Sequence, residues 1–198
     1  MRYVGIDYSL SSPSICIYEE KGGSFFEDCR FFFLTDLKKC HVKTNKYDGR
    51  PHKEWKCDEE RYWNITNWVL SVIEPNDTIF LEGYSMASTG RVFAIAENAG
   101  LLKFHLWTRK NPVVIFPPTV IKKFASGSGR ADKKILEEFF IKETGEDIRA
   151  LLDLTPKQEN PISDIIDSYF ICKKGYFDGN TKENTTKKKA TKKRKKRD

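Results

Sequence analysis

The sequence has few cysteines and no long hydrophobic run, and each shortage excludes a class of protein. Its five cysteines are odd in number and irregularly spaced, which suits a reducing compartment better than a framework of disulfide bonds. No apolar run approaches the roughly 18 residues that a membrane-spanning helix needs. Asp7 stands where a signal peptide would need an apolar stretch. We therefore expect a cytoplasmic protein that does not contact a membrane.

The composition favours one folded α/β domain that ends in a basic tail. Of the 198 residues, 39% are hydrophobic and 13% are aromatic, which suffices for a sizeable core. Residues 182–198 hold ten of the 35 basic residues and two of the 28 acidic ones, which leaves 25 basic and 26 acidic residues elsewhere. The net charge of +7 therefore belongs to the tail, and we expect residues 179–198 to be disordered and residues 1–178 to form the domain.

The hydrophobic pattern predicts a mixed five-stranded sheet with helices on both faces. Three strands joined by short turns form an antiparallel meander at 2–9, 14–20 and 25–34. A long polar loop is expected at 35–57, where no strand or helix pattern is visible. Helices and buried strands then alternate, with helices at 58–73, 88–107, 118–124, 130–144 and 161–174 and strands at 77–84 and 113–116.

Acidic residues stand at places where the surrounding sequence is apolar. Asp7 lies in the first strand, Glu82 ends an apolar run, and Asp164 and Asp167 share one face of the last helix. Each acid alone has an ordinary explanation, such as a turn cap, an ion pair or a solvated helix face. Together they would repel one another unless cations compensated them, and oxygen ligands favour Mg²⁺ or Mn²⁺. Two such ions about 4 Å apart would clamp the attacking and leaving oxygens of a phosphodiester.

The order of the motifs resembles a known family. The segments that carry the resemblance are Gly5–Ser9, Leu81–Tyr84 with the helix end Ala96–Gly100, Pro118–Lys134, and Ser163–Ser168. They resemble, in the same order, the motifs of the RuvC-type Holliday junction resolvases, which have the ribonuclease H-like fold. The most specific of them is Pro118–Lys134, with its proline, basic helix, Gly-x-Gly loop and Ala-acid-Lys helix start.

The resemblance implies a fold, a reaction and an assembly. It implies a ribonuclease H-like domain and a homodimer that cuts four-way DNA junctions in paired strands, leaving 5′-phosphate and 3′-hydroxyl ends. Asp7, Glu82, Asp164 and Asp167 would be the catalytic acids and would bind two Mg²⁺, for which Mn²⁺ would substitute. Lys122 and Lys133 fall at the positions of the family's DNA-contacting lysines. We add as DNA-binding candidates Lys123, Arg130 and Tyr84.

Two features depart from the family pattern. Segment 35–57 has no counterpart, so an elaborated region is expected between the third strand and the first helix. In the loop after the second acid, where the bacterial enzymes have a stacking aromatic residue, the nearest large residues are Tyr84, Met86 and Phe93, and none aligns cleanly. Together with the basic tail, these departures fit a phage or viral version of the family.

Other patterns in the sequence admit more than one interpretation. Cys40, His41, His52 and Cys57 suggest a zinc site, but their spacing matches no common finger, so loop residues are the default interpretation. Basic and aromatic residues alternate at 50–56, which suits contact with a nucleic acid or, equally, a solvated loop. The tail would attract phosphates without sequence preference, and in a eukaryotic host it would also suit nuclear targeting.

Three rival functions use the same residues differently. A nuclease of the same fold that cuts flaps or forks would have the same four acids. A nucleotide-binding ATPase of the actin and sugar-kinase type would use the Gly5–Ser9 motif for phosphate, but it would need a second domain and would give Asp164 and Asp167 no role. A DNA-binding module without catalysis would not need all four acids.

Overall fold

The centre of the molecule is a mixed six-stranded sheet in the order β4-β3-β2-β1-β5-β6. The structure is a computed structural model that describes residues 1–83 and 92–194, with side chains described as far as residue 179. The strands β1, β2 and β3 form the expected antiparallel meander, whereas β5 runs parallel to β1 and β6 runs parallel to β5. The strand bounds are β1 Arg2–Asp7, β2 Ser14–Glu19, β3 Cys29–Leu34, β4 Tyr47–Arg50, β5 Thr78–Glu82 and β6 Val113–Phe116.

Strand β4 lies inside the segment 35–57 that was expected to be a loop, so the sheet has one strand more than predicted. It pairs parallel with β3 after a 3₁₀ turn, η1, at Lys38–Cys40. The Tyr47 ring is buried and stacks on Phe31 at 5.2 Å between centroids. A Cβ atom on Gly49 would overlap the carbonyl oxygen of Cys40, so this strand is packed closely. Asp and Gly are rare in strands, which is why Tyr-Asp-Gly-Arg gives no strand signal.

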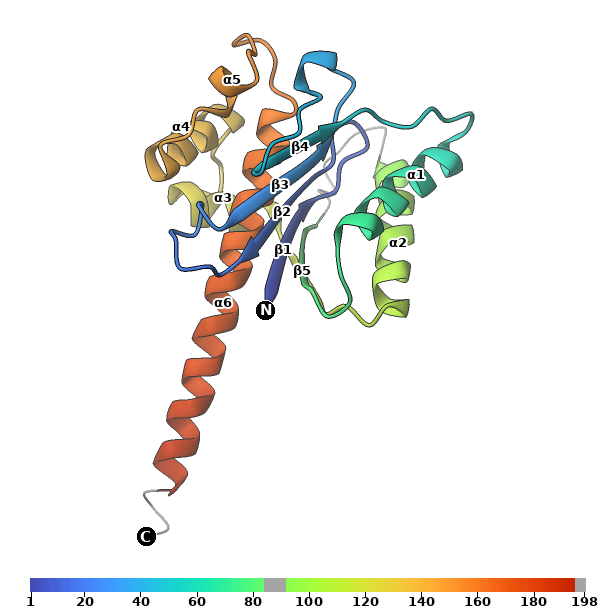
Figure 1. The fold of residues 1–198 in the computed structure, drawn as a ribbon. Coiled ribbons are helices and arrows are strands. Elements are labelled where there is room, and N and C mark those ends of the chain that lie inside the picture. Colours follow the sequence, from blue (N-terminus) through green and yellow to red (C-terminus); the bar gives the residue numbers. More distant parts are fainter. Residues whose placement is uncertain (84–91, 195–198) are drawn as a thin grey trace.

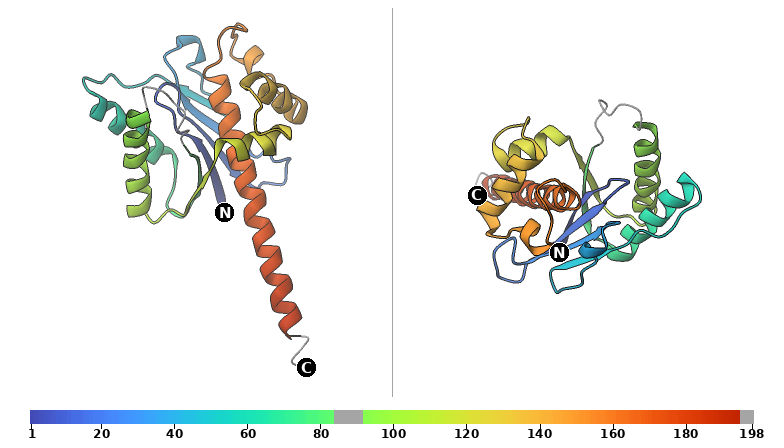
Figure 2. Two further views of the ribbon diagram at one scale, coloured as in Figure 1. Left: turned by 180° about the vertical axis from the view of Figure 1, so that it is seen from behind. Right: turned by 90° about the horizontal axis from the view of Figure 1, so that it is seen from above.

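Helices cover both faces of the sheet, as predicted (Figures 1 and 2). Helices α1 and α2 pack on one face, and the other helices lie on the opposite face, with α6 against the sheet. The short helix α5 was not predicted. The helix bounds are α1 Asp58–Val72, α2 Val92–Thr108, α3 Pro118–Ser126, α4 Lys133–Thr144, α5 Ile148–Leu151 and α6 Ile162–Arg194.

Helix α6 is packed unusually closely against the middle of the sheet. A Cβ atom on Gly5 of β1 would overlap the backbone of Ser168 and Cys172 in α6. Likewise, a Cβ atom on Gly175 of α6 would overlap the ring of Phe80 in β5. The two glycines let helix and sheet approach closely. The first turns of α6 are thereby held near the end of β1.

Two elements differ from the sequence predictions. Strand β6 was expected to be buried, but Val114 is 41% exposed and Ile115 is 49% exposed, because β6 is an edge strand of the sheet. The last helix was expected to end near Lys174, whereas α6 continues to Arg194 and its ribbon extends well beyond the sheet (Figure 1). Lysine favours helix, so the basic sequence does not force an end. Among the described residues, no helix is long and apolar enough to span a membrane.

Candidate active site

The first two acids of the site end neighbouring parallel strands. Asp7 is the last residue of β1 and Glu82 is the last residue of β5. The register pairs Ile6 with Leu81, so both acids emerge at the same edge of the sheet. Parallel strands place their carboxyl ends together, which is where open α/β sheets bind ligands.

The other two acids come from the beginning of α6. Asp164 is only 6% exposed, and its Oδ2 accepts hydrogen bonds from the hydroxyls of Ser12 at 2.5 Å and Ser163 at 3.3 Å. Asp164 also shares a hydrogen bond with Asp7. Asp167 lies one turn further along the helix. The structure therefore brings together the four acids that were predicted to act together.

The pKa values of the four carboxyl groups are all raised, first because they are buried and, for Asp7, Glu82 and Asp167, also because other carboxylates face them. The pKa of Asp7 is well above its usual value, since burial is reinforced by Asp164, Asp167 and Glu82. Burial and the charge of Asp167 raise the pKa of Glu82 to about 8. Burial and Asp164 raise the pKa of Asp167 to about 7, and burial also raises that of Asp164. Without a compensating cation, the site is therefore costly to ionise fully.

A cavity of about 480 Å³ opens at these acids. Asp7, Glu82 and Asp167 line it together with Lys122 and Lys133. The two lysines are close enough to lower the pKa of Asp167, and Lys122 also lowers that of Glu82. The cavity thus combines carboxylates with cations, as a site for a phosphate group beside metal ions requires.

The fold brings some of the predicted DNA-binding residues to the acid cavity and leaves others outside it. Lys122 and Lys133 lie in the cavity lining, whereas Lys123 and Arg130 are exposed and do not belong to it. Tyr84 lies outside the described residues. The Gly127-Ser128-Gly129 loop joins α3 to α4, and Gly127 ends α3 with a φ of 81°, a conformation that favours glycine. Asp132 then caps α4 by accepting a hydrogen bond from the backbone N–H of Ile135, which sets Lys133 at the first turn.

The donor atoms of the site suit a hard divalent cation. All four acids offer oxygen ligands, and burial raises the pKa of each carboxyl group. Within residues 1–83 and 92–179, no group of three or more His, Cys, Asp or Glu side chains already surrounds a common ion position. The four residues suggested as a zinc site, Cys40, His41, His52 and Cys57, therefore do not form such a group either. The Nε2 atoms of His41 and His52 instead form hydrogen bonds with the backbone oxygens of Thr35 and Ser11.

Sequence reasoning missed three residues of this site. Ser12 is buried and orients Asp164, yet a serine in a turn between strands gives no signal of its own. Tyr8 lines the cavity and its hydroxyl hydrogen-bonds with that of Thr66 at 2.8 Å. Arg61 also lines the cavity, and its Nη2 donates to the carbonyl oxygen of Leu10 at 2.8 Å. Only its place in the first turns of a helix marks Arg61 in the sequence.

Comparisons with known proteins agree with this arrangement. No model of a known protein family matches the chain. The chain is 26% identical over 137 residues to the crossover junction endodeoxyribonuclease RuvC of Prochlorococcus marinus (strain NATL1A), which covers 67% of this chain and 77% of the relative. The structure of Thermus thermophilus RuvC superposes with a TM-score of 0.51 at 19% identity, covering 87% of this chain and 91% of that one.

A second structure of the same protein, T. thermophilus RuvC in complex with a Holliday junction substrate, gives a TM-score of 0.54 at 17% identity and covers 87% of this chain and 90% of that one. These similarities confirm the resemblance to RuvC-type resolvases and the ribonuclease H-like fold.

Proposed function

We propose that this chain is a metal-dependent, structure-selective DNA endonuclease that resolves four-way junctions by paired nicks. The observation that carries the proposal is the meeting of four acids from β1, β5 and α6, three of which line one cavity, where each acid raises the pKa of another or is bonded to it. The similarity to RuvC, a crossover junction endodeoxyribonuclease, supports the choice of substrate. Cleavage would leave 5′-phosphate and 3′-hydroxyl ends.

In this proposal the four acids Asp7, Glu82, Asp164 and Asp167 hold two Mg²⁺, and Mn²⁺ substitutes for them. When bound, such ions lower the pKa of water and stabilise charge on the reacting phosphate. The protein's own part is to fix the ligands. Ser12 and Ser163 hold one carboxylate oxygen of Asp164 in place, and the close packing of α6 on Gly5 keeps that helix beside β1.

Basic residues around the cavity would bind the DNA backbone. Lys122 and Lys133 line the cavity beside the acids, so their ammonium groups would contact the phosphates next to the cut. Lys123 and Arg130 are exposed and would contact the backbone further away. We retain Tyr84 as a candidate contact at the junction. The basic residues of 179–198, beyond a nuclease domain at 1–178, would add salt-sensitive attraction to DNA.

A homodimer would place one such site on each of two strands. Helix α2 carries three exposed aromatic residues, Phe93 at 82%, Phe104 at 57% and Trp107 at 74% exposure. They are spaced by eleven and three residues, so they fall on one stripe of the helix. An exposed aromatic stripe of this kind marks a protein interface, and a second copy of the chain is the partner that paired nicking requires.

The test of the proposed function is cleavage of a labelled immobile four-way junction in Mg²⁺, beside a flap, a fork, a linear duplex and an RNA–DNA hybrid. We expect paired, symmetric nicks in the junction that disappear with EDTA. Equal cutting of flaps and forks would widen the function to a branched-DNA nuclease. Hydrolysis of ATP without cutting of any DNA would show that the four acids form a different kind of site.

A further inference from the structure

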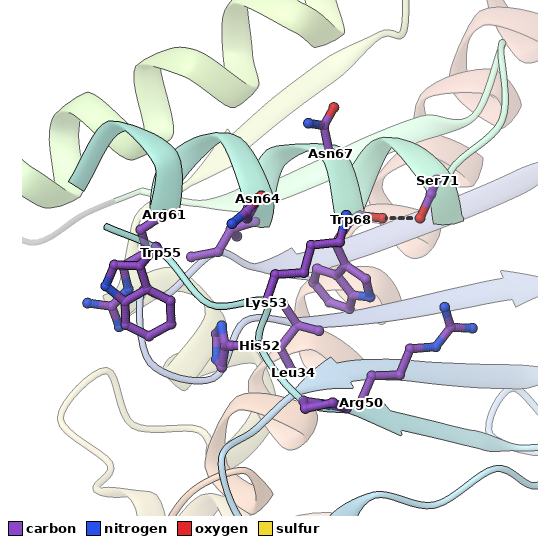
Figure 3. Close-up of a pocket in the computed structure, with 12 residues that line it drawn as sticks. Leu34, Arg50, His52, Lys53, Trp55, Arg61, Asn64, Asn67, Trp68 and Ser71 are labelled. Carbon is purple, nitrogen blue, oxygen red and sulfur yellow. Dashed lines mark hydrogen bonds between the residues drawn. The ribbon is translucent and has the colours of Figure 1, made fainter. Parts of the chain in front are cut away.

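A second cavity, of about 310 Å³, lies between α1 and the segment that follows β4 (Figure 3). Its lining includes the indoles of Trp55 and Trp68 and the imidazole of His52, with Leu34 and Ile65 as apolar neighbours. The volume falls at the lower end of the range of about 300–1000 Å³ that small-molecule sites occupy. The cavity thus has the size and the aromatic walls of a site for one flat ring.

The charge of this cavity is positive. Among the described residues, the charged side chains that line it are Arg50, Lys53 and Arg61, and all are cationic. Arg50 is already paired with Asp48 by two hydrogen bonds of 2.7 and 2.6 Å. Lys53 is exposed, and Figure 3 shows His52 between the two tryptophans. Lys53 and Arg61 are therefore the residues that would contact an anion bound in this cavity.

Arg61 connects this cavity to the acid cavity, because it lines both. Its guanidinium carbon lies over the ring of Trp55, 4.5 Å from the ring centroid, and Figure 3 shows the two side chains together at one end of the cavity. Its Nε is buried and has no hydrogen-bond partner among the described residues. A planar cation that stacks on an indole and lines both cavities is a ready partner for a phosphate that passes between them.

We propose that the second cavity binds an unpaired nucleotide of the DNA strand that enters the acid cavity. The base stacks on Trp55, and its phosphate contacts Lys53 and Arg61. Duplex DNA hides the faces of its bases, so stacking on an indole requires a base that has left its pair. This inference rests on the proposed function, since it places the bound nucleotide beside the site of cutting. It also assigns a role to the elaborated segment between β3 and α1.

The test measures binding without cleavage. Fluorescence anisotropy in EDTA would compare a four-way junction that has a short single-stranded gap beside the crossing with a fully paired linear duplex. We expect Trp55→Ala and Lys53→Ala to bind the gapped junction about 5- to 10-fold more weakly, as loss of one stacked base predicts, with little change on the duplex. Trp55→Phe keeps an aromatic ring and should retain most of the affinity.

The matched control is Trp63→Ala. Trp63 is 47% exposed on the same helix α1, packs near His105 of α2 at 5.5 Å between centroids and lines neither cavity. It should bind both DNAs as the parent does. In a separate arm, free dAMP is titrated against the parent, and we expect it to bind far more weakly than the gapped junction because it lacks the neighbouring contacts.

Three results would overturn the inference. Parental affinity of Trp55→Ala and Lys53→Ala for the gapped junction would show that the cavity does not bind DNA. Equal losses on gapped junction and duplex would show backbone contact without a bound base. Binding of dAMP as tight as that of the gapped junction would identify a site for free nucleotides. The parent's cleavage of the junction in Mg²⁺ is measured separately, so any of these results can coexist with the proposed function.

Discussion

At the scale of single residues, the surroundings of the four acids favour a bound proton or a bound cation over free carboxylates. Ser12 and Ser163 hold Asp164, Asp164 is hydrogen-bonded to Asp7, and burial raises the pKa of each acid. A proton on one acid and a divalent cation between several relieve the same repulsion. Proton release and metal binding should therefore be coupled.

Replacing Asp7 distinguishes the role of the four acids in cleavage from their effect on the stability of the protein. We expect Asp7→Asn to reduce junction cleavage by more than about 100-fold, since even the loss of a residue behind a metal ligand costs about 10- to 100-fold. Junction binding in EDTA should remain within a few-fold of the parent. The metal-free protein should become more stable, because a buried acid that three neighbouring carboxylates repel is removed. Loss of binding together with cleavage would contradict this division.

The stability of the metal-free protein should fall as the pH rises. Glu82 has a pKa of about 8 and Asp167 of about 7 in the folded chain, both above the usual values of 4.5 and 3.8. The folded state then binds more protons than the unfolded state between these limits, so unfolding becomes easier from about pH 4 to pH 8. We expect the melting temperature in EDTA to fall by at least about 2–4 °C over this range.

Glu82→Gln provides the control for this pH dependence, because it removes one of the groups whose pKa is raised. Its melting temperature in EDTA should change less with pH than that of the parent. Added Mg²⁺ should stabilise the parent more at pH 8 than at pH 5. Identical pH profiles for the parent and Glu82→Gln would show that Glu82 does not titrate in this range.

At the scale of elements, the position of α6 on the sheet decides whether the site exists. Gly5 and Gly175 permit the close contact between α6 and strands β1 and β5. The same contact brings two acids of a helix to two acids of the strands. The acids themselves were predictable, because a carboxylate at the end of an apolar strand is conspicuous in a sequence. The close approach was not, since a glycine in a strand or a helix does not reveal which backbone lies opposite.

Glycines one turn apart in α6 offer a matched test of this packing. A Cβ atom on Gly175 would overlap the Phe80 ring, whereas one on Gly179 would meet only Tyr3, at 3.9 Å. We expect Gly175→Ala to lose about 1–3 kcal/mol of stability and much of the cleavage. Gly179→Ala should gain up to about 1 kcal/mol, because alanine favours helix. Urea unfolding of both variants checks this, and equal stabilities would contradict the packing.

Other elements show which parts of the fold the sequence predicts and which it does not. Strands β1, β2 and β5 and helices α1 and α4 were predicted close to their observed bounds, because their apolar patterns are regular, whereas β3 begins at Cys29 and not at residue 25. Strand β4 was missed because its sequence lacks strand formers, and β6 was expected to be buried because an apolar run does not reveal an edge position. The second cavity was missed because it depends on how an irregular segment lies against α1. Only its basic and aromatic composition was visible beforehand.

At the scale of the whole molecule, two regions outside the acid cavity decide how it would meet DNA. The aromatic stripe of α2 would join two copies, and the basic tail would hold them to phosphates. The three aromatic residues of the stripe do not line the acid cavity, and the tail follows the four acids in the sequence. They can therefore be altered without changing the chemistry of the site.

A charge on the α2 stripe should separate the two copies. We expect Trp107→Glu to weaken dimerisation at least about 100-fold, since an unpaired charge would be buried at the interface. Sedimentation velocity at micromolar concentration would then show a monomer, and paired nicks would become single nicks. Phe139→Glu is the control, because Phe139 is 38% exposed on α4 at the other face of the sheet. A dimer that survives Trp107→Glu would place the interface elsewhere.

Removal of residues 182–198 should weaken DNA binding mainly through charge. The deleted segment has ten basic and two acidic residues. For each phosphate that the tail neutralises, its removal should make the slope of log affinity against log salt shallower by about 0.9. Affinity measured from low to high salt should show the shallower slope, while the preference for junctions over duplex stays. An unchanged slope would mean that the tail does not touch DNA.

The acids of this site are supplied by the first strand, by a strand in the middle of the chain and by the last helix. During synthesis, Asp7 and Glu82 leave the ribosome well before Asp164 and Asp167. A nascent chain therefore carries only half of the cluster until α6 has emerged and docked against Gly5. The order of the elements along the chain would thus delay the proposed nuclease activity until the domain is complete.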